Sequence, residues 1–556
     1  MNQFPSRRAF IGGSAAAAAL VAGGAAGASA KARRTGPSAG RRAGWTTRPV
    51  RIESGLVAGV PALLPGVTVY KGIPYGASTA GDGRWRPPRP APRWDGVRVA
   101  DTWGDACVQD TSMVPAGQVP GLSEDCLNLN VWTAAGDPGE RRPVLIWAYG
   151  GRDSAMWASQ PLYDGAGLAR KGLVVVTFNR RVGPFGGLAT PQLTAESGHD
   201  ASGNYVLMDT IAALQWIQRN IHAFGGDPDR VTLGGWSAGS ACTWDLACSP
   251  LARGLFSRGL AESGLEYTKD PALSHLAGSY ITLDAAQEQG TALMQALGVS
   301  TSGELRALPA STVQAAGGDI GSYVLDGWVL PRGYTETLAL RAQNDVPFIA
   351  GNTKDENNAW LAGAGGPPPA SISLAMFQAG AQAEFGARAA DFLALYPAAT
   401  DDEANAQAGI SGQDDERIST FLWGTQWRAA GRAPAYTYFF THTPPGTDTA
   451  NPVVPGNASG AYHGSDIYYF LDNLYGTPRP WQRADYQIAD TLSSYLVNFA
   501  AAGDPNGRGL TRWPAVDPGR RQVMAVGDSF GVIPIASDAA RQQFFTDYFE
   551  SQTTAW

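Results

Sequence analysis

Residues 231–239 read VTLGGWSAG, and this stretch decides the fold. The apolar run at 231–233 predicts a buried strand, and residues 241–247 (ACTWDLA) predict a helix soon after it. A G-x-S-x-G turn between a strand and a helix is a nucleophile elbow, in which the glycines leave room for a sharp turn and the serine is exposed. The stretch therefore predicts Ser237 as an acyl-transfer nucleophile.

Local context selects Ser237, because the G-x-S-x-G pattern occurs three times in a chain with 69 glycines. The copy at 36–40 lies in a segment rich in Pro, Gly and Arg, with no strand before it. The copy at 527–531 is followed by an extended run that contains Pro534, so no helix follows. Only the copy at 235–239 has a strand, a turn and a helix in order.

The composition predicts one large folded domain over residues 51–556. Of the 556 residues, 44% are hydrophobic and 16% are charged, which allows a large core and argues against wholesale disorder. The net charge of −7 gives no reason to expect a nucleic acid as partner. The oligomeric state is not indicated.

Residues 1–30 predict a twin-arginine export signal peptide. Arg7 and Arg8 precede a run rich in Ala and Gly at 12–27, which ends in the A-x-A sequence at 28–30. The run lacks the large apolar residues that drive insertion, so no transmembrane segment is expected after signal removal. Residues 31–50 are basic without an acid and predict a flexible linker. We expect a secreted or periplasmic protein.

A nucleophilic serine needs a base, and the base needs an orienting acid. In the α/β-hydrolase order, the acid and then the histidine follow the serine along the chain. Two of the five histidines, His442 and His463, come late enough, and His463 is preferred because it lies in a loop just before the apolar residues 467–470. The others precede the serine or follow it too closely: His199, His222 and His275.

The acid is expected at the end of a strand between the serine and the histidine. Residues 346–351 (VPFIAG) predict that strand, and the loop after it carries Asp355 and Glu356. No comparable strand precedes the alternative group of Asp414, Asp415 and Glu416.

Backbone N–H groups are expected to stabilise the oxyanion of the reaction. One comes from Ala238, where the helix N-terminus adds a favourable dipole. The others are expected from a glycine-rich loop after an earlier strand. Residues 143–148 (PVLIWA) predict that strand, and YGGR at 149–152 follows it.

Together these pieces resemble the type-B carboxylesterase family, the cholinesterase-like branch of the α/β-hydrolases. The resemblance covers most of the chain from about residue 51, and further stretches carry it: EDCLNLNVW at 124–132, NRRVGPFG at 179–186, FGGDP at 224–228, NFA at 498–500, GDPN at 503–506 and WP at 513–514. It implies the α/β-hydrolase fold, an α/β fold with a large, mostly parallel central sheet flanked by helices, and cap or loop insertions over an active-site gorge. It also implies an exported serine esterase that acts on small-molecule carboxylic esters without metal or organic cofactor.

The resemblance assigns roles to particular residues. It implies a triad of Ser237, Glu356 and His463, although Asn357 replaces the glycine that usually follows the glutamate. The implied donors of the oxyanion hole are the N–H groups of Gly151, Arg152 and Ala238.

Three further residues match family features around the site. Ser263, in AESG at 261–264, matches a serine that supports the triad, and Cys107 and Cys126 match the family's first disulfide. The spacing of Cys242 and Cys248 on the helix after the elbow predicts two buried thiols instead of a bridge.

Two departures from the family pattern bear on the substrate. The oxyanion loop is usually HGGGF and here reads YGGRD at 149–153, and Trp236 stands where the elbow usually has a glutamate. The Arg152 guanidinium either pairs with Asp153 and holds the loop, or binds a carboxylate or other acceptor-rich group of the substrate. In the second case, Trp157 and Trp236 would wall the pocket.

Two other functions use the same residues differently. An extracellular acyltransferase would pass the acyl group to an alcohol instead of water. A non-catalytic binding module of the cholinesterase-like type would usually lack a triad residue, whereas all three positions are filled in this chain.

The Arg152 hypothesis predicts a selective effect of Arg152→Gly. If the guanidinium binds a substrate carboxylate, kcat/KM for esters that bear a free carboxylate falls by about one to two powers of ten. Neutral p-nitrophenyl esters are then affected less. An equal change on both kinds of ester would mean that Arg152 shapes the loop and does not recognise the substrate.

Overall fold

A computed structural model describes residues 48–112, 114, 117–151, 156–274, 278–317, 320–356, 371–447, 459–553 and 556. The predicted signal peptide, nearly all of the basic linker, and the histidine at 275 lie outside the described residues. None of the described helices is both long enough and apolar enough to cross a membrane.

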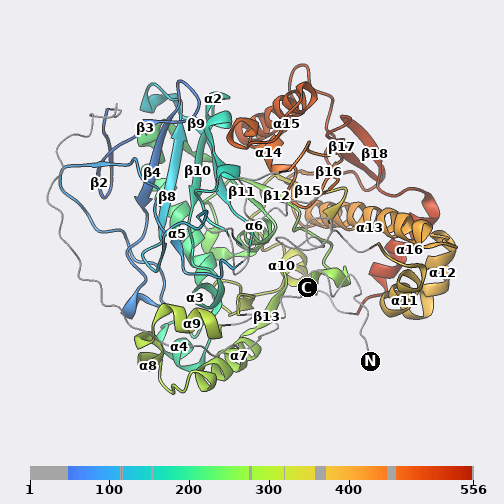
Figure 1. Cartoon of the computed structure of the whole chain (residues 1–556), viewed down its shortest axis with the longest axis horizontal. Helices are drawn as coiled ribbons and strands as arrows, with labels where there is room; N and C mark the ends of the chain where they lie inside the picture. The colour runs from blue at the N-terminus through green and yellow to red at the C-terminus, as the bar shows by residue number, and fades with distance from the viewer. Residues whose placement is uncertain are drawn as a thin grey trace.

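An 11-stranded sheet runs through the molecule (Figure 1). The strands from β17 to β10 are parallel, and β18, β8, β4 and β3 pair antiparallel with their neighbours. Their order across the sheet is β18 (Gly531–Pro534), β17 (Gln522–Val526), β16 (Ala435–Phe440), β15 (Phe348–Thr353), β12 (Arg258–Glu262), β11 (Gly226–Trp236), β9 (Arg142–Ala148), β10 (Val174–Phe178), β8 (Asn128–Thr133), β4 (Thr68–Pro74) and β3 (Val60–Pro61).

Three smaller sheets lie outside this one. They pair β1 (Val50–Ile52), β2 (Gly55–Ala58) and β5 (Val97–Val99); β13 (Tyr280–Thr282) and β14 (Tyr323–Leu325); and β6 (Ala106–Cys107) and β7 (Leu122–Ser123).

Helices flank the large sheet. Helix α15 packs on β9 and β11, while α5 and α6 pack on β11 and α13 packs on β15 and β16 (Figure 1). The α-helices are α2 (Ala166–Arg170), α3 (Gly183–Gly187), α4 (Pro191–Glu196), α5 (Tyr205–Asn220), α6 (Ala238–Cys248), α7 (Leu283–Ala296), α8 (Ser302–Ala307), α9 (Ala310–Ala316), α10 (Tyr334–Ala339), α11 (Leu374–Phe385), α12 (Ala389–Leu395), α13 (Asp401–Ala430), α14 (Ile467–Phe470), α15 (Arg483–Ala502) and α16 (Ala539–Glu550).

The central strands are buried along their whole length, and are mostly apolar, because helices cover both faces of the sheet. All five residues of β10 and all six of β15 are buried. A parallel sheet with two covered faces requires such continuous apolar runs instead of an alternating pattern. The predicted strands at 143–148 and 346–351 are β9 and β15, and the predicted helix at 241–247 lies within α6. The α/β-hydrolase fold predicted from the sequence is confirmed.

Local signals set both ends of helix α15. Helix α15 begins with a capping box between Gln482 and Asp485 and ends at Gly503, whose φ of 75° is the left-handed conformation that glycine adopts most readily.

At the loop after β10, the buried Arg181 pairs with Asp209 of α5 at 2.7 Å. This ion pair fastens the NRRVG segment to a helix that packs on the sheet.

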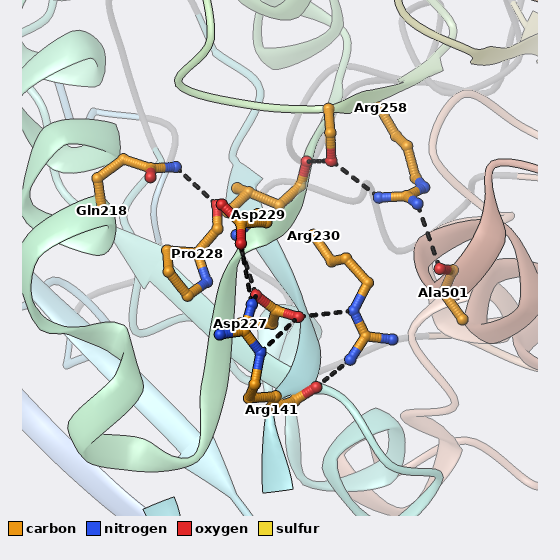
Figure 2. A network of polar contacts seen from close by, with 10 residues as sticks. Arg141, Gln218, Asp227, Pro228, Asp229, Arg230, Arg258 and Ala501 are labelled. Atoms are coloured by element: carbon orange, nitrogen blue, oxygen red, sulfur yellow. Dashed lines mark hydrogen bonds and ion pairs between the residues drawn. The ribbon is translucent and has the colours of Figure 1, made fainter. Parts of the chain in front are cut away.

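The amino-terminal edge of the parallel strands holds a network of charges (Figure 2). Asp227, at the start of β11, accepts hydrogen bonds from Arg141 at 2.6 Å and from Arg230 at 2.9 Å. The burial of Asp227 opposes its ionisation, but these hydrogen bonds and charges hold its pKa below the usual range. The FGGDP motif therefore joins the beginnings of β9 and β11 at the edge opposite to Ser237.

Two long insertions leave the sheet at its carboxyl edge. The segment between β12 and β15 contains α7 to α10, and the segment between β15 and β16 contains α11 to α13. That these insertions cap an active-site gorge stays a prediction.

Candidate active site

Ser237 lies in a strained turn between β11 and α6. Its φ of 55° and ψ of −121° are unusual for a residue with a side chain, and such a conformation costs roughly 1–3 kcal/mol. A Cβ on Gly235 would overlap the backbone of Gly239, and a Cβ on Gly239 would overlap the carbonyl oxygen of Ala148. The elbow predicted from the sequence is present, and its two glycines cannot be replaced without moving backbone.

Hydrogen bonds tie this turn to its neighbours. The Ser237 N–H donates to the carbonyl oxygen of Glu262 on β12 at 2.9 Å, and the Ala241 N–H donates to the Ser237 carbonyl at 3.0 Å. Ser237 is partly exposed although residues 231–236 and 238–240 are buried. The turn thus presents the hydroxyl-bearing side chain at the surface of an otherwise buried segment.

The acid and the base come together from two loops that are far apart in the sequence. The Nδ1–H of His463 donates to Oε2 of Glu356 at 2.5 Å. The second oxygen, Oε1, accepts from the Ser263 hydroxyl at 2.6 Å and from the Thr353 N–H at 2.5 Å. The structure therefore brings the predicted acid, base and supporting serine into one hydrogen-bonded line.

This line keeps Glu356 ionised. Burial opposes the charge, but the charge of His463 and the hydrogen bonds from His463, Ser263 and Thr353 together lower the pKa of Glu356. An ionised carboxylate at Nδ1 fixes the tautomer in which Nε2 is the proton acceptor of the imidazole. This geometry suits His463 to the role of a base, and that role stays a prediction.

His442, the alternative base, has both ring nitrogens in contact with other residues. In His442, Nδ1 lies 2.6 Å from an oxygen of Asp528 and Nε2 lies 2.9 Å from an oxygen of Asp485. Both ring nitrogens therefore serve contacts between the loop after β16, the loop after β17 and the start of α15. This arrangement explains the presence of His442 without a catalytic role.

The rival acids also have other partners. Asp355 accepts the Ala461 N–H at 2.8 Å and so fastens the loop that leads to His463. Asp414 lies within α13 and accepts hydrogen bonds from Tyr396, Arg417 and Ser537. Glu356, in contrast, is hydrogen-bonded to His463.

The loop after β9 lies beside the nucleophile. A Cβ on Gly150 would lie 3.2 Å from the Cβ of Ser237, and Gly151 has a φ of 71°. Ala238 is the first residue of α6, so its N–H points out of a helix N-terminus. Arg152 and Asp153 lie outside the described residues, so their predicted roles stay predictions.

Trp236 packs between the oxyanion loop and the base. Its ring centroid lies 4.9 Å from that of His463, and a Cβ on either Gly150 or Gly464 would come within 2.6 Å of the indole. Trp157 packs with Ala106 and other residues in a small apolar cluster of its own. That the two tryptophans wall a substrate pocket stays a prediction, but Trp236 holds His463 from one side.

Two buried carboxyl groups beside the triad are not evident from the sequence pattern. Glu262 precedes Ser263 and Asp466 follows His463 by three residues, and both are fully buried. Burial and the neighbouring Asp466 raise the pKa of Glu262 well above its usual range. Burial likewise raises the pKa of Asp466 to about 7, although the Tyr438 hydroxyl donates to it at 2.6 Å. Their positions next to two motif residues are the only signal that could have found them.

The cysteines are buried as predicted for Cys242 and Cys248. Cys107 and Cys126 are neighbours in the structure, where a hydrogen bond from Cys107 and burial raise the pKa of the Cys126 thiol. The structure has them as two thiols, and their disulfide stays a prediction.

A model of the carboxylesterase family matches residues 46–544. The chain belongs to the carboxylesterase family. It is accordingly a carboxylic ester hydrolase with the α/β-hydrolase fold, and the family resemblance seen in the sequence is confirmed.

Several relatives of this carboxylesterase are similar over most of their length. Fumonisin B1 esterase from Sphingopyxis macrogoltabida is 33% identical over 496 residues, which cover 86% of each chain. Para-nitrobenzyl esterase from Bacillus subtilis (strain 168) is 29% identical over 508 residues, covering 86% of this chain and 95% of the relative. A solved PNB esterase has a TM-score of 0.72 at 26% identity, covering 89% of this chain and 99% of that one.

The triad assignment predicts an order of effects within matched pairs of variants. Ser237→Ala and His463→Ala are expected to lower kcat for p-nitrophenyl butyrate by about 10⁴–10⁶, as removal of a triad member does elsewhere. His442→Ala is expected to keep kcat and lose thermal stability, because its contacts are structural. Glu356→Gln is expected to lose more activity than Asp355→Asn, and a reversal within either pair would contradict the assignment.

The raised pKa of Asp466 predicts a dependence of stability on pH. The folded chain holds this proton up to about pH 7, whereas the unfolded carboxyl releases it near its usual value of 3.8. The folded state therefore binds more protons in this window, and the free energy of unfolding falls as pH rises through it. Asp466→Asn is expected to reduce the fall between pH 5 and pH 8 by roughly 2 kcal/mol in urea titrations.

The exposed Asp229→Asn is the control for this measurement, and its curve is expected to run parallel to that of the wild type. A curve for Asp466→Asn that also ran parallel would show that Asp466 is ionised in the folded chain throughout this range.

Proposed function

We propose that the chain is an exported serine esterase that hydrolyses small-molecule carboxylic esters through an acyl-Ser237 intermediate. The observation that carries the proposal is the hydrogen-bonded line Ser263–Glu356–His463 at the same sheet edge as the strained Ser237. An acid, a base and a nucleophile in this order form the arrangement that acyl transfer requires.

Acylation uses the base first as a proton acceptor. Oγ of Ser237 attacks the ester carbonyl carbon while Nε2 of His463 takes the hydroxyl proton. The carbonyl oxygen becomes an oxyanion, which the N–H groups of Ala238, Gly151 and Arg152 stabilise. When the tetrahedral intermediate collapses, the bond to the alkoxy oxygen breaks and the proton on His463 passes to the leaving alcohol.

Deacylation repeats these steps with water. His463 takes a proton from the water as its oxygen attacks the acyl carbon, and the second tetrahedral intermediate expels Ser237, which recovers its proton from His463. The ionised Glu356 stabilises the imidazolium that forms in both halves of the reaction. Every proton transfer is made by a side chain of this chain.

The acyl and alcohol parts of the substrate are not assigned. Two relatives are named for esterase activity on fumonisin B1 and on para-nitrobenzyl esters, which supports a small organic ester as the substrate class here. A guanidinium from Arg152, which follows Gly151 in the sequence, would further favour an ester that carries an acidic or acceptor-rich group.

Export is the proposed context of this activity. Arg7, Arg8 and the Ala/Gly-rich run before residue 30 support passage through the twin-arginine route, and the mature enzyme would then act outside the cytoplasm. In an oxidising compartment the adjacent Cys107 and Cys126 would form the predicted disulfide. Replacing Arg7 and Arg8 by Lys is expected to retain a reporter fused to residues 1–35 in the cytoplasm, and unchanged secretion would contradict the twin-arginine route.

A kinetic experiment tests the proposed reaction against acyl transfer to an alcohol. Purified protein is mixed with p-nitrophenyl butyrate, and p-nitrophenol and butyrate are measured with and without an added short-chain alcohol. A hydrolase releases p-nitrophenol and butyrate in equal amounts and forms little butyrate ester of the alcohol. Dominant transfer to the alcohol in aqueous buffer would favour the acyltransferase, and an absence of p-nitrophenol release would favour a binding module.

A further inference from the structure

Arg180 is a fully buried arginine to which no carboxylate is paired in the described part of the chain. It follows β10 in the NRRVG segment, and only 1% of it is exposed. Its neighbour Arg181 shows the usual solution, an ion pair with Asp209. In Arg180, Nε and Nη1 are buried without a hydrogen-bond partner among the described residues. Because a guanidinium stays protonated, a positive charge is held inside the protein at this point.

The contacts of Arg180 are reciprocal with one residue, Tyr149. Nη2 of Arg180 donates to the Tyr149 carbonyl oxygen at 2.8 Å, and the guanidinium lies 4.5 Å from the centre of the Tyr149 ring. In return, the Tyr149 hydroxyl lies 3.3 Å from both the carbonyl oxygen and the N–H of Arg180, donating to the first and accepting from the second. The side chain of each residue therefore holds the backbone of the other.

This pair acts on the oxyanion loop because Tyr149 is the residue directly before Gly150 and Gly151. The peptide group between Tyr149 and Gly150 is held at its carbonyl oxygen, to which Arg180 donates at 2.8 Å. Gly150 in turn lies against Ser237 and Trp236. A small rotation of this peptide group would move the N–H groups that follow it relative to the serine.

We propose that Arg180 is a positioning residue that sets the oxyanion loop through Tyr149. Its hydrogen bond fixes the peptide group that leads into the loop, and its buried positive charge favours negative charge at the site in a low-dielectric interior. The proposal rests on the proposed esterase function. It also gives a role to Tyr149, which stands where the family usually has a histidine.

The test compares three variants of this pair with a matched control. Arg180→Met keeps an unbranched side chain and removes the charge and the donors, Arg180→Lys keeps the charge without the planar fork, and Tyr149→Phe removes the hydroxyl contacts. The control is Arg258→Met, because Arg258 is a half-buried arginine at the opposite edge of the sheet, where it donates to the Ala501 carbonyl at 3.2 Å (Figure 2).

The measurements are kcat and KM for p-nitrophenyl butyrate, the inhibition constant of an alkyl trifluoromethyl ketone, and the melting temperature. The ketone forms an oxyanion on Ser237, so its inhibition constant reports on the oxyanion hole. A purely structural role of Arg180 would leave this constant unchanged. Removing one oxyanion donor costs 10²–10³ in kcat elsewhere, so Arg180→Met is expected to lower kcat by about 30- to 100-fold. We expect its KM to change less than about 3-fold and the inhibition constant to rise in parallel with the loss of kcat.

The two milder variants are expected to lower kcat less than Arg180→Met does. Arg180→Lys and Tyr149→Phe are expected to lower kcat by roughly 3- to 10-fold, because each keeps part of the reciprocal contact. Arg258→Met is expected to lower the melting temperature and to keep kcat. If Arg180→Met does not fold, the two milder variants carry the test on their own.

A folded Arg180→Met with wild-type kcat and inhibition constant would overturn the proposal, as would unchanged kinetics in both milder variants. That failure is distinguishable from failure of the proposed function. If the wild type hydrolyses the ester and Ser237→Ala does not, the esterase stands and only the role of Arg180 falls. If the wild type has no esterase activity, both fall.

Discussion

The close approach of the turn around Ser237 to the end of β9 is the constraint on which the rest of the site depends. Gly239 lies so near the Ala148 carbonyl oxygen that neither it nor Gly235 can carry a Cβ. The turn must therefore be tight, which places Ser237 at positive φ and exposes its side chain. The same contact puts the loop after β9, with Gly150, beside the nucleophile. One steric condition thus places the serine and the oxyanion loop together.

The acids around the site differ in pKa because their surroundings differ. Glu356 is buried, yet three hydrogen bonds and the imidazole lower its pKa, so it can orient and stabilise the base. Glu262 and Asp466 are equally buried, but their contacts do not offset the burial, and their pKa values are raised. While it is protonated, either carboxyl adds no negative charge that would compete with Glu356 for the imidazolium. Arg180 contributes charge of the opposite sign behind the oxyanion loop.

Much of this site follows from local sequence. The elbow, the strands β9 and β15 and the helix α6 are each set by a contiguous run of residues, so pattern and turn chemistry find them. The choice between His442 and His463 is harder to make from local sequence, because both lie in loops. His442 follows a strand-like segment, and His463 precedes an apolar one. The structure separates the two histidines because Asp485 and Asp528, from segments further along the chain, each hydrogen-bond one ring nitrogen of His442. Elimination narrows the histidines to this pair and the sequence favours His463, while the tertiary contacts supply the structural reason.

The residues that sequence reasoning missed have the same character. Apart from their places near Ser263 and His463, nothing local distinguishes Glu262 and Asp466 from solvated acids. Arg180 stands next to Arg181, and the sequence gives no sign that only Arg181 has a carboxylate partner among the described residues. Burial and pairing are properties of the packed structure, since they depend on which distant strands and loops meet. The signals for such residues are weak in a single sequence even where the fold itself is clear.

The steric condition at the elbow can be measured directly by active-site titration of Gly239→Ala. The control is Gly409→Ala in α13, where a Cβ meets nothing within 4 Å. Each protein is titrated with a fluorophosphonate, and the labelled peptide is identified by mass spectrometry. We predict stoichiometric labelling of Ser237 in the wild type and the control, and loss of most titratable serine in Gly239→Ala. Full labelling of Ser237 in Gly239→Ala at wild-type thermal stability would contradict the account.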